Sequence, residues 1–126
     1  MTDLELCKKH KIQMINQNSE SIINMGYYCS TQDVILAMTD RDIMRYHILD
    51  VRSDTLTFPI YLRTRDMTEY AVYNNASELH TFMDNAFLWS VNIEGSGGAL
   101  IQSILACTTI EQVNSIVDSR TWEDFI

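Results

Sequence analysis

Residues 75–107 carry a long helical pattern that is interrupted near its middle by glycines. Asn75, followed closely by Glu78, is typical of a helix start, where a polar side chain caps free backbone N–H groups. Glycine inside a helix costs about 1 kcal/mol relative to alanine, so three glycines within 95–98 need a reason. They indicate either a break between two helices or the close approach of a second backbone to one long helix. The apolar residues at helical spacing are Leu79, Phe82, Met83, Ala86, Phe87, Val91, Leu100, Ile101, Ile104 and Leu105, with Trp89 and Ile93 beside them.

The segments before and after this stretch predict a mixed α and β domain. An amphipathic helix is expected over Asp3–Asn24, with Thr2 as its cap. Two pairs of β-favouring segments, 25–29 with 33–38 and 55–63 with 67–74, predict two hairpins. Thr108 or Thr109 is expected to cap a short final helix. The expected fold class is therefore α+β: a small antiparallel sheet of hairpins packed with a long C-terminal helix and shorter helices.

The domain organisation that follows is a single domain over residues 1–126. Its parts are an N-terminal helix (1–24), two hairpins that flank a short helix (25–74), and a helical region (75–120). The short helix is predicted to begin after Thr39 and to bury one face. The residues expected inward are Ile43, Met44, His47, Ile48 and Val51, and those expected outward are Asp40, Arg41, Asp42 and Arg45. Trp122 and Phe125 are expected to anchor the C-terminal segment.

The net charge argues against a nucleic-acid polymer as the partner. The chain has 9 basic and 17 acidic residues, which gives a formal net charge of −8. Binding to a phosphate backbone needs clustered Lys and Arg, which an acidic chain of this kind lacks. Several arginines nevertheless fall close together in the middle of the sequence, so we expect two or three of them to be available to a small anion. They are Arg41, Arg45, Arg52, Arg63 and Arg65.

The cysteines and the N-terminus predict a location in the cytoplasm, which for a viral protein means the host cytoplasm. Cys7, Cys29 and Cys107 are an odd number without a CxxC pair, as is typical of reduced cytosolic thiols. The first eleven residues are polar and show no secretory signal, and no apolar run reaches membrane-spanning length. We therefore expect a soluble protein without a membrane partner.

Motifs that name a reaction are not found in the sequence. The histidines His10, His47 and His80 lie far apart, and none has a Cys or carboxylate at metal-ligand spacing. The glycines at 95–98 follow a helix rather than a strand and lack the lysine of a P-loop. No GxSxG, HExxH or Cys–His arrangement occurs. We therefore expect a binding protein rather than an enzyme, with no cofactor and no metal.

The residues that remain form an inventory for binding. Aromatic rings stack on nucleobases, arginines hold phosphate oxygens, and an asparagine recognises the edge of a base or ribose. Phe82, Trp89 and Asn92 lie on adjoining turns of the long helix, while Tyr61 and Arg63 share a strand face near Arg65 at the second hairpin. The alternative for Phe82 and Trp89 is plain core packing. For Asn92, between apolar neighbours, we expect a polar partner, because a buried unsatisfied amide costs about 1–3 kcal/mol.

Several short segments resemble a known family in their order. They are Gly26-Tyr27-Tyr28, the helix start Asp40-Arg41-Asp42, the second hairpin, the long helix, and the closing run from Ile104 to Val113 with its Thr108-Thr109 pair and Glu111. This order resembles a phage domain of unknown function that is found on tail-fibre-associated proteins. It is also similar to the small phage Thoeris anti-defence proteins that share this kind of domain. The likeness covers most of residues 24–120.

The resemblance to the anti-defence family implies a ligand and a mode of action. Its members are sponges that bind a cyclic ADP-ribose isomer, made by a TIR-domain enzyme, and withhold it without cleaving it. The implied pocket lies at a dimer contact, so we expect a homodimer or higher homo-oligomer. Phe82 and Asn92 match the aromatic and polar roles of that pocket, whereas Arg63, Arg65 and Arg52 are proposed as phosphate ligands from chemistry alone. The alternative is a structural or assembly domain of a phage tail-fibre-associated protein.

Overall fold

The computed structural model describes residues 1–126 and is an α+β fold, as the sequence predicts. Four α-helices and two short 3₁₀ helices accompany two separate antiparallel hairpins, β1–β2 and β3–β4. In chain order the elements are α1 (Asp3–Asn24), β1 (Tyr27–Cys29), β2 (Val34–Leu36), α2 (Asp40–Val51), η1 (Ser53–Thr55), β3 (Ile60–Arg63), β4 (Tyr70–Tyr73), α3 (Ala76–Leu105), α4 (Ile110–Ser115) and η2 (Trp122–Phe125).

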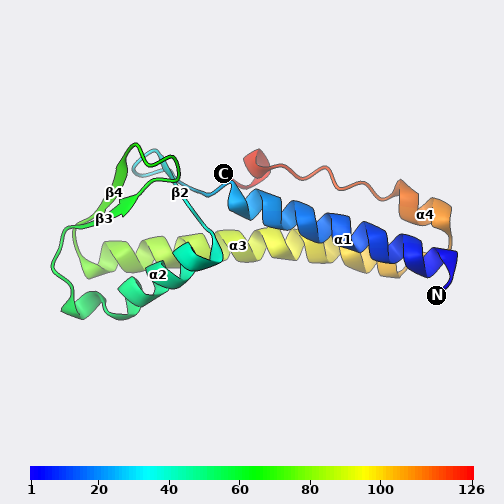
Figure 1. Ribbon diagram of the computed structural model, residues 1–126, viewed down its shortest axis with the longest axis horizontal. Helices are drawn as coiled ribbons and strands as arrows, with labels where there is room; N and C mark the ends of the chain where they lie inside the picture. Colours follow the sequence, from blue (N-terminus) through cyan, green and yellow to red (C-terminus); the bar gives the residue numbers. More distant parts are fainter.

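The molecule is elongated along α3, and this helix extends from one end of the molecule to the other (Figure 1). At one end, both hairpins and α2 surround the first half of α3. At the other end, α1 lies antiparallel to the second half of α3, and α4 closes the end of the pair. After α4 the chain returns along the two helices to η2, so that the C-terminus lies near the middle of the molecule.

α3 is one unbroken helix of 30 residues, which settles the choice that the glycines left open. The Asn75 side chain accepts a hydrogen bond from the Glu78 N–H and caps the first turn, as predicted. Gly97 has an internal reason to be glycine. A Cβ at this position would lie 2.7 Å from Ser19 Oγ on α1 and 3.1 Å from Arg120 Nη1. The absence of a side chain therefore lets α1 and the returning chain approach α3 closely.

The helix caps set the element boundaries where local signals are strong. Thr2 and Glu5 form a capping box at the start of α1, and Thr39 and Asp42 form another at the start of α2. Both boundaries agree with the sequence-based expectation. The strands are shorter than expected, because residues 53–55 form a 3₁₀ turn and β3 begins only at Ile60.

The main hydrophobic core lies where the hairpins, α2 and the first half of α3 meet. Tyr46 of α2 is 4% exposed, its hydroxyl donates to the Ala37 carbonyl oxygen at 2.8 Å, and its ring packs edge-on against Phe82. The other core residues are Ile22, Cys29, Val34, Leu36, Met38, Leu62, Ala71, Tyr73, Leu79, Ala86, Trp89 and Ile93.

The predicted inward face of α2 is wrong for most of its residues. Met44, Ile48 and Val51 are 65%, 50% and 66% exposed, and His47 is also exposed, whereas Ile43 is half-buried. The helix is turned so that Tyr46 enters the core instead. A buried tyrosine that satisfies its hydroxyl on a backbone carbonyl buries a larger apolar surface than a methionine or valine would. The outward placement of Arg41 and Arg45 is confirmed.

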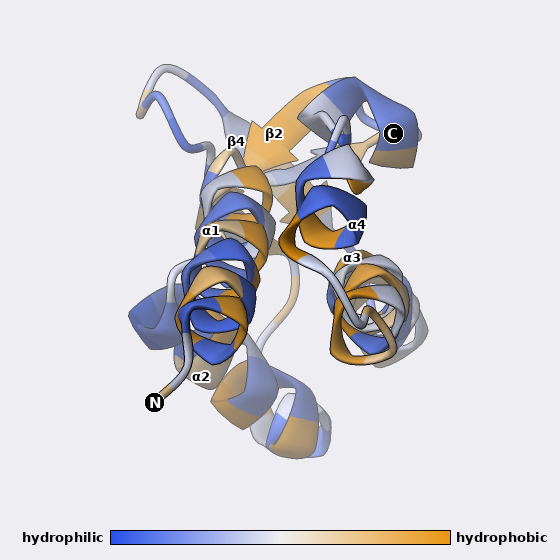
Figure 2. Cartoon of the chain, turned by 90° about the vertical axis from the view of Figure 1, so that its right-hand side faces the viewer, coloured by the Kyte–Doolittle hydropathy of each residue, from blue (hydrophilic) through white to orange (hydrophobic).

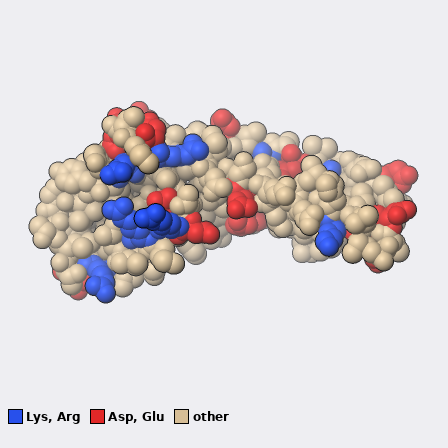
Figure 3. All heavy atoms as spheres, viewed as in Figure 1, with Lys and Arg blue, Asp and Glu red and all other residues tan.

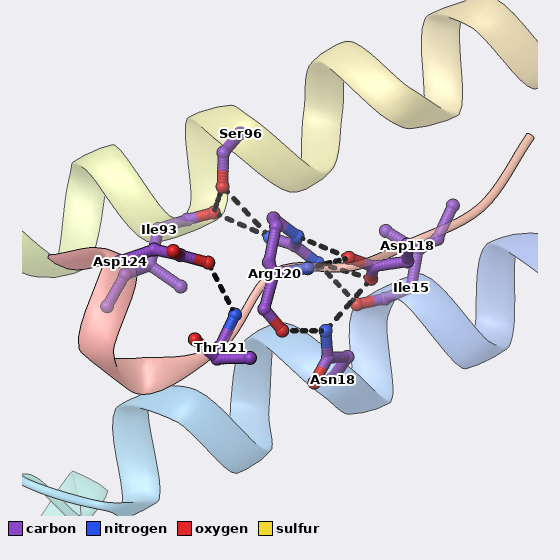
Figure 4. A network of polar contacts seen from close by, with 8 residues as sticks. All are labelled: Ile15, Asn18, Ile93, Ser96, Asp118, Arg120, Thr121 and Asp124. Carbon is purple, nitrogen blue, oxygen red and sulfur yellow. Dashed lines mark hydrogen bonds and ion pairs between the residues drawn. The ribbon is translucent and has the colours of Figure 1, made fainter.

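The returning C-terminal chain is fastened to both long helices by Arg120 (Figure 4). Its guanidinium donates to the Ile93 carbonyl oxygen and Ser96 Oγ of α3 at 3.0 and 2.9 Å. It also donates to the Ile15 carbonyl oxygen of α1 at 3.1 Å and to Asp118. Arg120 is therefore a structural residue that bridges α1 and α3.

Trp122 and Phe125 anchor the same segment, as predicted. Both are half-buried and pack against the main core, and the Trp122 indole N–H donates to the Gly26 carbonyl oxygen at 2.8 Å. A smaller core of Ile15, Ile104 and Val113 joins α1, α3 and α4 at the far end of the molecule. None of the helices combines the length and hydrophobicity that crossing a bilayer would require.

Candidate anion-binding groove

A groove of about 490 Å³ runs between α2 and the β3–β4 hairpin and is lined by four arginines. The arginines come from two elements that are far apart in sequence but adjacent in space. The groove residues are Ala37, Thr39, Arg41, Asp42, Arg45, Tyr46, Tyr61, Leu62, Arg63, Thr64, Arg65, Met67 and Tyr70.

One wall of the groove is the exposed side of α2. Arg41 and Arg45 are four residues apart, a spacing that places two helical side chains one above the other on the same face. Both are exposed, because the opposite face of the helix carries Tyr46 into the core. The position of Tyr46 therefore determines the direction in which the two guanidinium groups project.

The other wall is β3 and the residues that follow it. Tyr61 and Arg63 are two residues apart, so both side chains leave the same face of the strand, while Leu62 between them is buried. Arg65 follows the end of β3, and its backbone N–H donates to the Ile35 carbonyl oxygen of the other hairpin at 2.8 Å. Backbone hydrogen bonding thus holds the base of this wall in place.

The four groove arginines are not ion-paired within the chain. The salt bridges of the protein are made by His80, with Asp50 and Asp84, and by Arg120 with Asp118. Blue side chains gather over α2 and the β3–β4 hairpin in Figure 3, although the chain as a whole has a net charge of −8. Because a converging set of cations without carboxylate partners repels itself, an anion bound among them relieves that repulsion.

Acidic side chains border the groove and limit its positive potential. Asp42 lies inside it, but its carboxylate accepts hydrogen bonds from the Thr39 N–H and hydroxyl at the start of α2. Arg65 also lines a neighbouring hollow that contains Asp33, Asp66 and Glu69. Arg41 likewise lines a hollow that contains Glu20, Asp40 and Glu94. Arg45 and Arg63, which line no such hollow, are therefore the strongest candidates to contact an anion.

Tyrosines supply the aromatic surface of the groove. Tyr61 and Tyr70 are 56% and 54% exposed, and their rings meet edge-to-face with centroids 6.1 Å apart. Tyr46 lies at the base, where burial, helped by the nearby Asp42 carboxylate, raises its pKa to about 12. Its phenol therefore stays neutral, while the exposed rings offer a surface on which a planar group can stack.

The six residues predicted from sequence as ligand contacts divide between three places. Tyr61, Arg63 and Arg65 lie together in the groove. Phe82 and Trp89 lie in the core at 4% and 6% exposed, with Phe82 between the rings of Tyr27, Tyr46 and Tyr73. Within one chain these residues do not form a single site.

Asn92 lies on the surface of α3, so the expectation that its amide is buried is wrong. Its apolar neighbours in sequence misled the interpretation, because Val91 is itself 45% exposed and only Ile93 is buried. Because the Asn92 amide is exposed to solvent, it needs no hydrogen-bond partner within the chain.

Arg41 and Arg45 belong to the arginines that the sequence offers to a small anion, but they are not among the six residues predicted as ligand contacts. The signal that identifies them is the four-residue spacing on a predicted helix, which precedes a strand that ends at Arg63, just before Arg65. What the sequence does not contain is the placement of α2 beside the second hairpin, which follows from the packing of Tyr46 and Leu62 in the same core.

A second hollow, of about 590 Å³, lies between the β1–β2 turn, the end of β4 and the start of α3. Phe82 and Tyr27 border it, and the rest of its lining includes the amides of Gln32, Asn74 and Asn85. It contains no basic residue, so it offers nothing that would favour a phosphate over water. Phe82 is thus near a hollow, but not near the arginines.

The chain shows no group of three or more His, Cys, Asp or Glu side chains positioned to hold a metal ion. Comparison with family models, with curated proteins and with solved structures found no match to this chain.

Proposed function

We propose that this protein binds a small phosphorylated ligand in the arginine groove and withholds it without cleaving it. The observation that carries the proposal is the convergence of four unpaired arginines from α2 and the β3–β4 hairpin in an otherwise acidic protein. Guanidinium groups bind phosphate oxygens through paired hydrogen bonds, and the exposed tyrosines accept a base or another planar group.

The size and charge of the groove favour a small molecule over a polymer. A volume of about 490 Å³ lies within the range of small-molecule sites, which are typically about 300–1,000 Å³. Patches of acidic side chains are scattered along the rest of the surface shown in Figure 3, which is mostly uncharged. A nucleic-acid duplex lying across the protein would meet these carboxylates beyond the groove, whereas a compact ligand would avoid them.

The candidate ligand is a cyclic ADP-ribose isomer, and the candidate role is a phage decoy that removes this signal from a TIR-based, Thoeris-type bacterial defence in the host cytoplasm. Support for this identity comes from the sequence resemblance, and the groove adds chemistry of the right kind: cations for two phosphates and tyrosines beside them. The groove side chains are chiefly arginines, tyrosines and threonines, and its one carboxylate is engaged at a helix cap. This composition suits binding better than acid–base catalysis.

Isothermal titration of the purified chain with cyclic ADP-ribose isomers, and with ADP and inorganic pyrophosphate as simpler probes, tests the proposal. We expect submillimolar binding of at least one probe, with affinity that falls as salt is added, because the contacts are electrostatic. The bound probe, released by heating, should be recovered intact. Failure of every probe to bind would overturn the proposal, and recovery of cleaved ligand would overturn the decoy mechanism.

The groove is tested by the double variant Arg45→Ala/Arg63→Ala. It removes one guanidinium from each wall, so we expect affinity to fall by about tenfold or more, equivalent to about 1.4 kcal/mol. Arg52, which was also a phosphate-ligand candidate from the sequence, does not line the groove. The matched control is therefore Arg52→Ala/Lys9→Ala, which removes the same charge from exposed positions outside the groove and should bind nearly as the wild type does. Equal loss in both variants would show that overall charge, and not the groove, attracts the ligand.

The predicted roles of Phe82 and Asn92 need a separate comparison. Asn92→Ala changes an exposed residue, so a loss of affinity there would indicate a direct ligand contact. Phe82→Ala truncates a core side chain and is expected to cost about 3–5 kcal/mol of stability, so its binding must be measured at a temperature where the fold persists. Normal binding by both variants would confine the site to the groove.

The alternative function, a structural or assembly domain of a phage tail, is favoured by a different observation. α3 exposes large apolar side chains on the face that the rest of the chain leaves uncovered. A protein that binds none of the phosphate probes but assembles through this face would fit the alternative better than the decoy.

A further inference from the structure

The outer face of α3 is apolar although nothing in the chain covers it. Phe87, Leu88 and Val91 are 63%, 56% and 45% exposed, whereas Ala86, Trp89 and Ile93 on the inner face are buried. In Figure 2, α3 shows little blue around its circumference, while α1 carries blue on its outer side. The solvated face of a helix that buries its opposite face is normally lined by polar and charged residues, so three large apolar side chains there need an explanation.

This part of α3 is also nearly free of charge. Between Asp84 and Glu111 the only charged residue is Glu94, whereas charged residues make up 21% of the whole chain. Solvated helix faces of an acidic protein normally carry many carboxylates. Glu94, three residues after Val91 and four before Gly98, shares this face. With one carboxylate there instead of many, the local repulsion between two copies of a protein with a net charge of −8 is lowered.

Gly95 and Gly98 lie on this same outer face and have no packing role within the chain. No atom lies within 4 Å of the position that a Cβ would take at either residue, in contrast to Gly97, which Ser19 and Arg120 crowd. Each glycine weakens the helix by about 1 kcal/mol relative to alanine. No contact within the chain compensates for this loss of helix stability, so a contact outside the chain is the remaining reason for glycine at both positions.

The order of these residues along α3 makes the face complementary to itself. Phe87, Val91, Gly95 and Gly98 follow one another at intervals of four, four and three residues, so they lie on one side of the helix. Phe87 stands one turn before Val91, and Gly95 stands one turn after it. When two such helices cross antiparallel with Val91 at the two-fold axis, each Phe87 faces the notch at Gly95 of the other copy.

We propose that the outer face of α3, formed by Phe87, Leu88, Val91, Gly95 and Gly98, is the contact surface for a second copy of this chain. In the two-fold arrangement, the Phe87 ring of each copy lies against the notch at Gly95 of the other copy, so the same contact is made twice. A basic partner protein would gain nothing from a face with so little charge. The contact is independent of the arginine groove and uses none of its residues.

A contact made chiefly by one helix is small, so the dimer is expected to be weak, with a dissociation constant in the micromolar range. Sedimentation velocity from low micromolar to millimolar protein measures it directly. The wild type should pass from monomer to dimer across that range. A chain that stays monomeric throughout would overturn the proposal, without bearing on ligand binding by the groove.

The test variant is Val91→Asp, which places two carboxylates against each other at the axis. Because Val91 is exposed, the monomer should keep its circular dichroism spectrum while the dissociation constant rises by about tenfold or more, equivalent to about 1.4 kcal/mol. The control is Val117→Asp, the same change at a valine that is 69% exposed on the returning chain. Equal weakening by both variants, or by neither, would overturn the assignment of the face.

A second variant tests the glycines without adding charge. Gly95→Ala/Gly98→Ala fills the notch and strengthens the helix, so we expect a monomer that melts at a higher temperature but associates more weakly than the wild type. Unfolding would lower the melting temperature as well as the association, so it cannot explain a higher melting temperature together with weaker association. Association as strong as that of the wild type would show that the notch is not used.

Discussion

At the scale of single residues, three glycines that look alike in sequence differ in their surroundings. A methyl group added at Gly97 would meet Ser19 Oγ at 2.7 Å, while the same group at Gly95 or Gly98 would meet no atom. Alanine gains about 1 kcal/mol over glycine in a helix interior. Whether a Gly→Ala substitution raises or lowers the free energy of unfolding therefore depends on the atoms around the glycine and not on helix propensity alone.

We expect Gly97→Ala to lower the free energy of unfolding, and Gly95→Ala or Gly98→Ala to raise it by up to about 1 kcal/mol each. Urea unfolding at a protein concentration low enough to keep the chain monomeric measures all three on one scale. A stabilising Gly97→Ala would mean that α1 and the Arg120 segment can move aside at little cost, and would contradict the tight approach of the three segments.

Asp118 gives the protein a defined sensitivity to acid. Hydrogen bonding and charge from Arg120 hold the pKa of Asp118 below its ordinary value of 3.8. The folded state thus keeps a carboxylate that the unfolded chain would protonate first, so this contribution to stability is complete above the ordinary pKa and is lost as pH falls through the lowered one.

The measurement is the melting temperature of the wild type and of Asp118→Asn between pH 7 and about pH 2, a window that spans the ordinary carboxyl pKa. We expect the variant to be less stable at neutral pH and to lose less stability on acidification. Parallel curves would show that Asp118 makes no net contribution through its charge.

At the scale of elements, the long helices were predictable because their ends carry local signals. The Thr2–Glu5 box and the Asn75 cap determine where α1 and α3 begin, and both signals lie within four residues in sequence. The face that α2 buries was not predictable in this way. Its choice of Tyr46 over Met44 or Ile48 depends on Ala37 and Phe82, which come from other segments.

The candidate site shows the same division. The helical pair Arg41 and Arg45 and the strand pair Tyr61 and Arg63 were each visible as a local spacing, but the docking of the two elements was not. Phe82 and Trp89 had the right chemistry for a ligand and also for a core, and periodicity alone does not separate the two. Burial resolves their place in the fold, at 4% and 6% exposed.

Arg120 connects the returning C-terminal chain to both α1 and α3 by hydrogen bonds. Replacing it with alanine removes the ion-pair partner of the partly buried Asp118, which keeps its hydrogen bond from Asn18, and also removes the donors to carbonyl groups of α1 and α3. We expect Arg120→Ala to cost about 2–3 kcal/mol, less than the about 3–5 kcal/mol for breaking a fully buried ion pair from one side. Arg120→Lys keeps the charge but lacks the several N–H donors of the planar guanidinium, so it should recover only part of the lost stability.

Hydrogen exchange of the two variants shows where the loss occurs. We expect amides of α1 and of the second half of α3 to exchange faster than in the wild type, while β1–β2 and β3–β4 stay protected, because the hairpins belong to the other core. Uniformly faster exchange would indicate that the two cores unfold as one unit.

At the scale of the whole molecule, charge and apolar surface are separated along one axis. The unpaired arginines lie with α2 and the hairpins, and the nearly uncharged outer face continues along α3. Salt should therefore weaken the two proposed interactions differently. Added salt screens phosphate binding at the groove, but it has little to screen at the face of α3. Titrating both interactions in the same salt series separates them.

The bridge made by Arg120 also has a consequence for biosynthesis. The hydrogen bond from Arg120 to the Ile15 carbonyl oxygen spans 105 positions in sequence. α1 therefore leaves the ribosome long before the segment that contains Arg120 has been synthesised. During that interval the apolar stripe of α1 has neither α3 nor the returning segment to cover it. The nascent helix is then an expected client for chaperones that recognise amphipathic segments, until translation has passed Arg120.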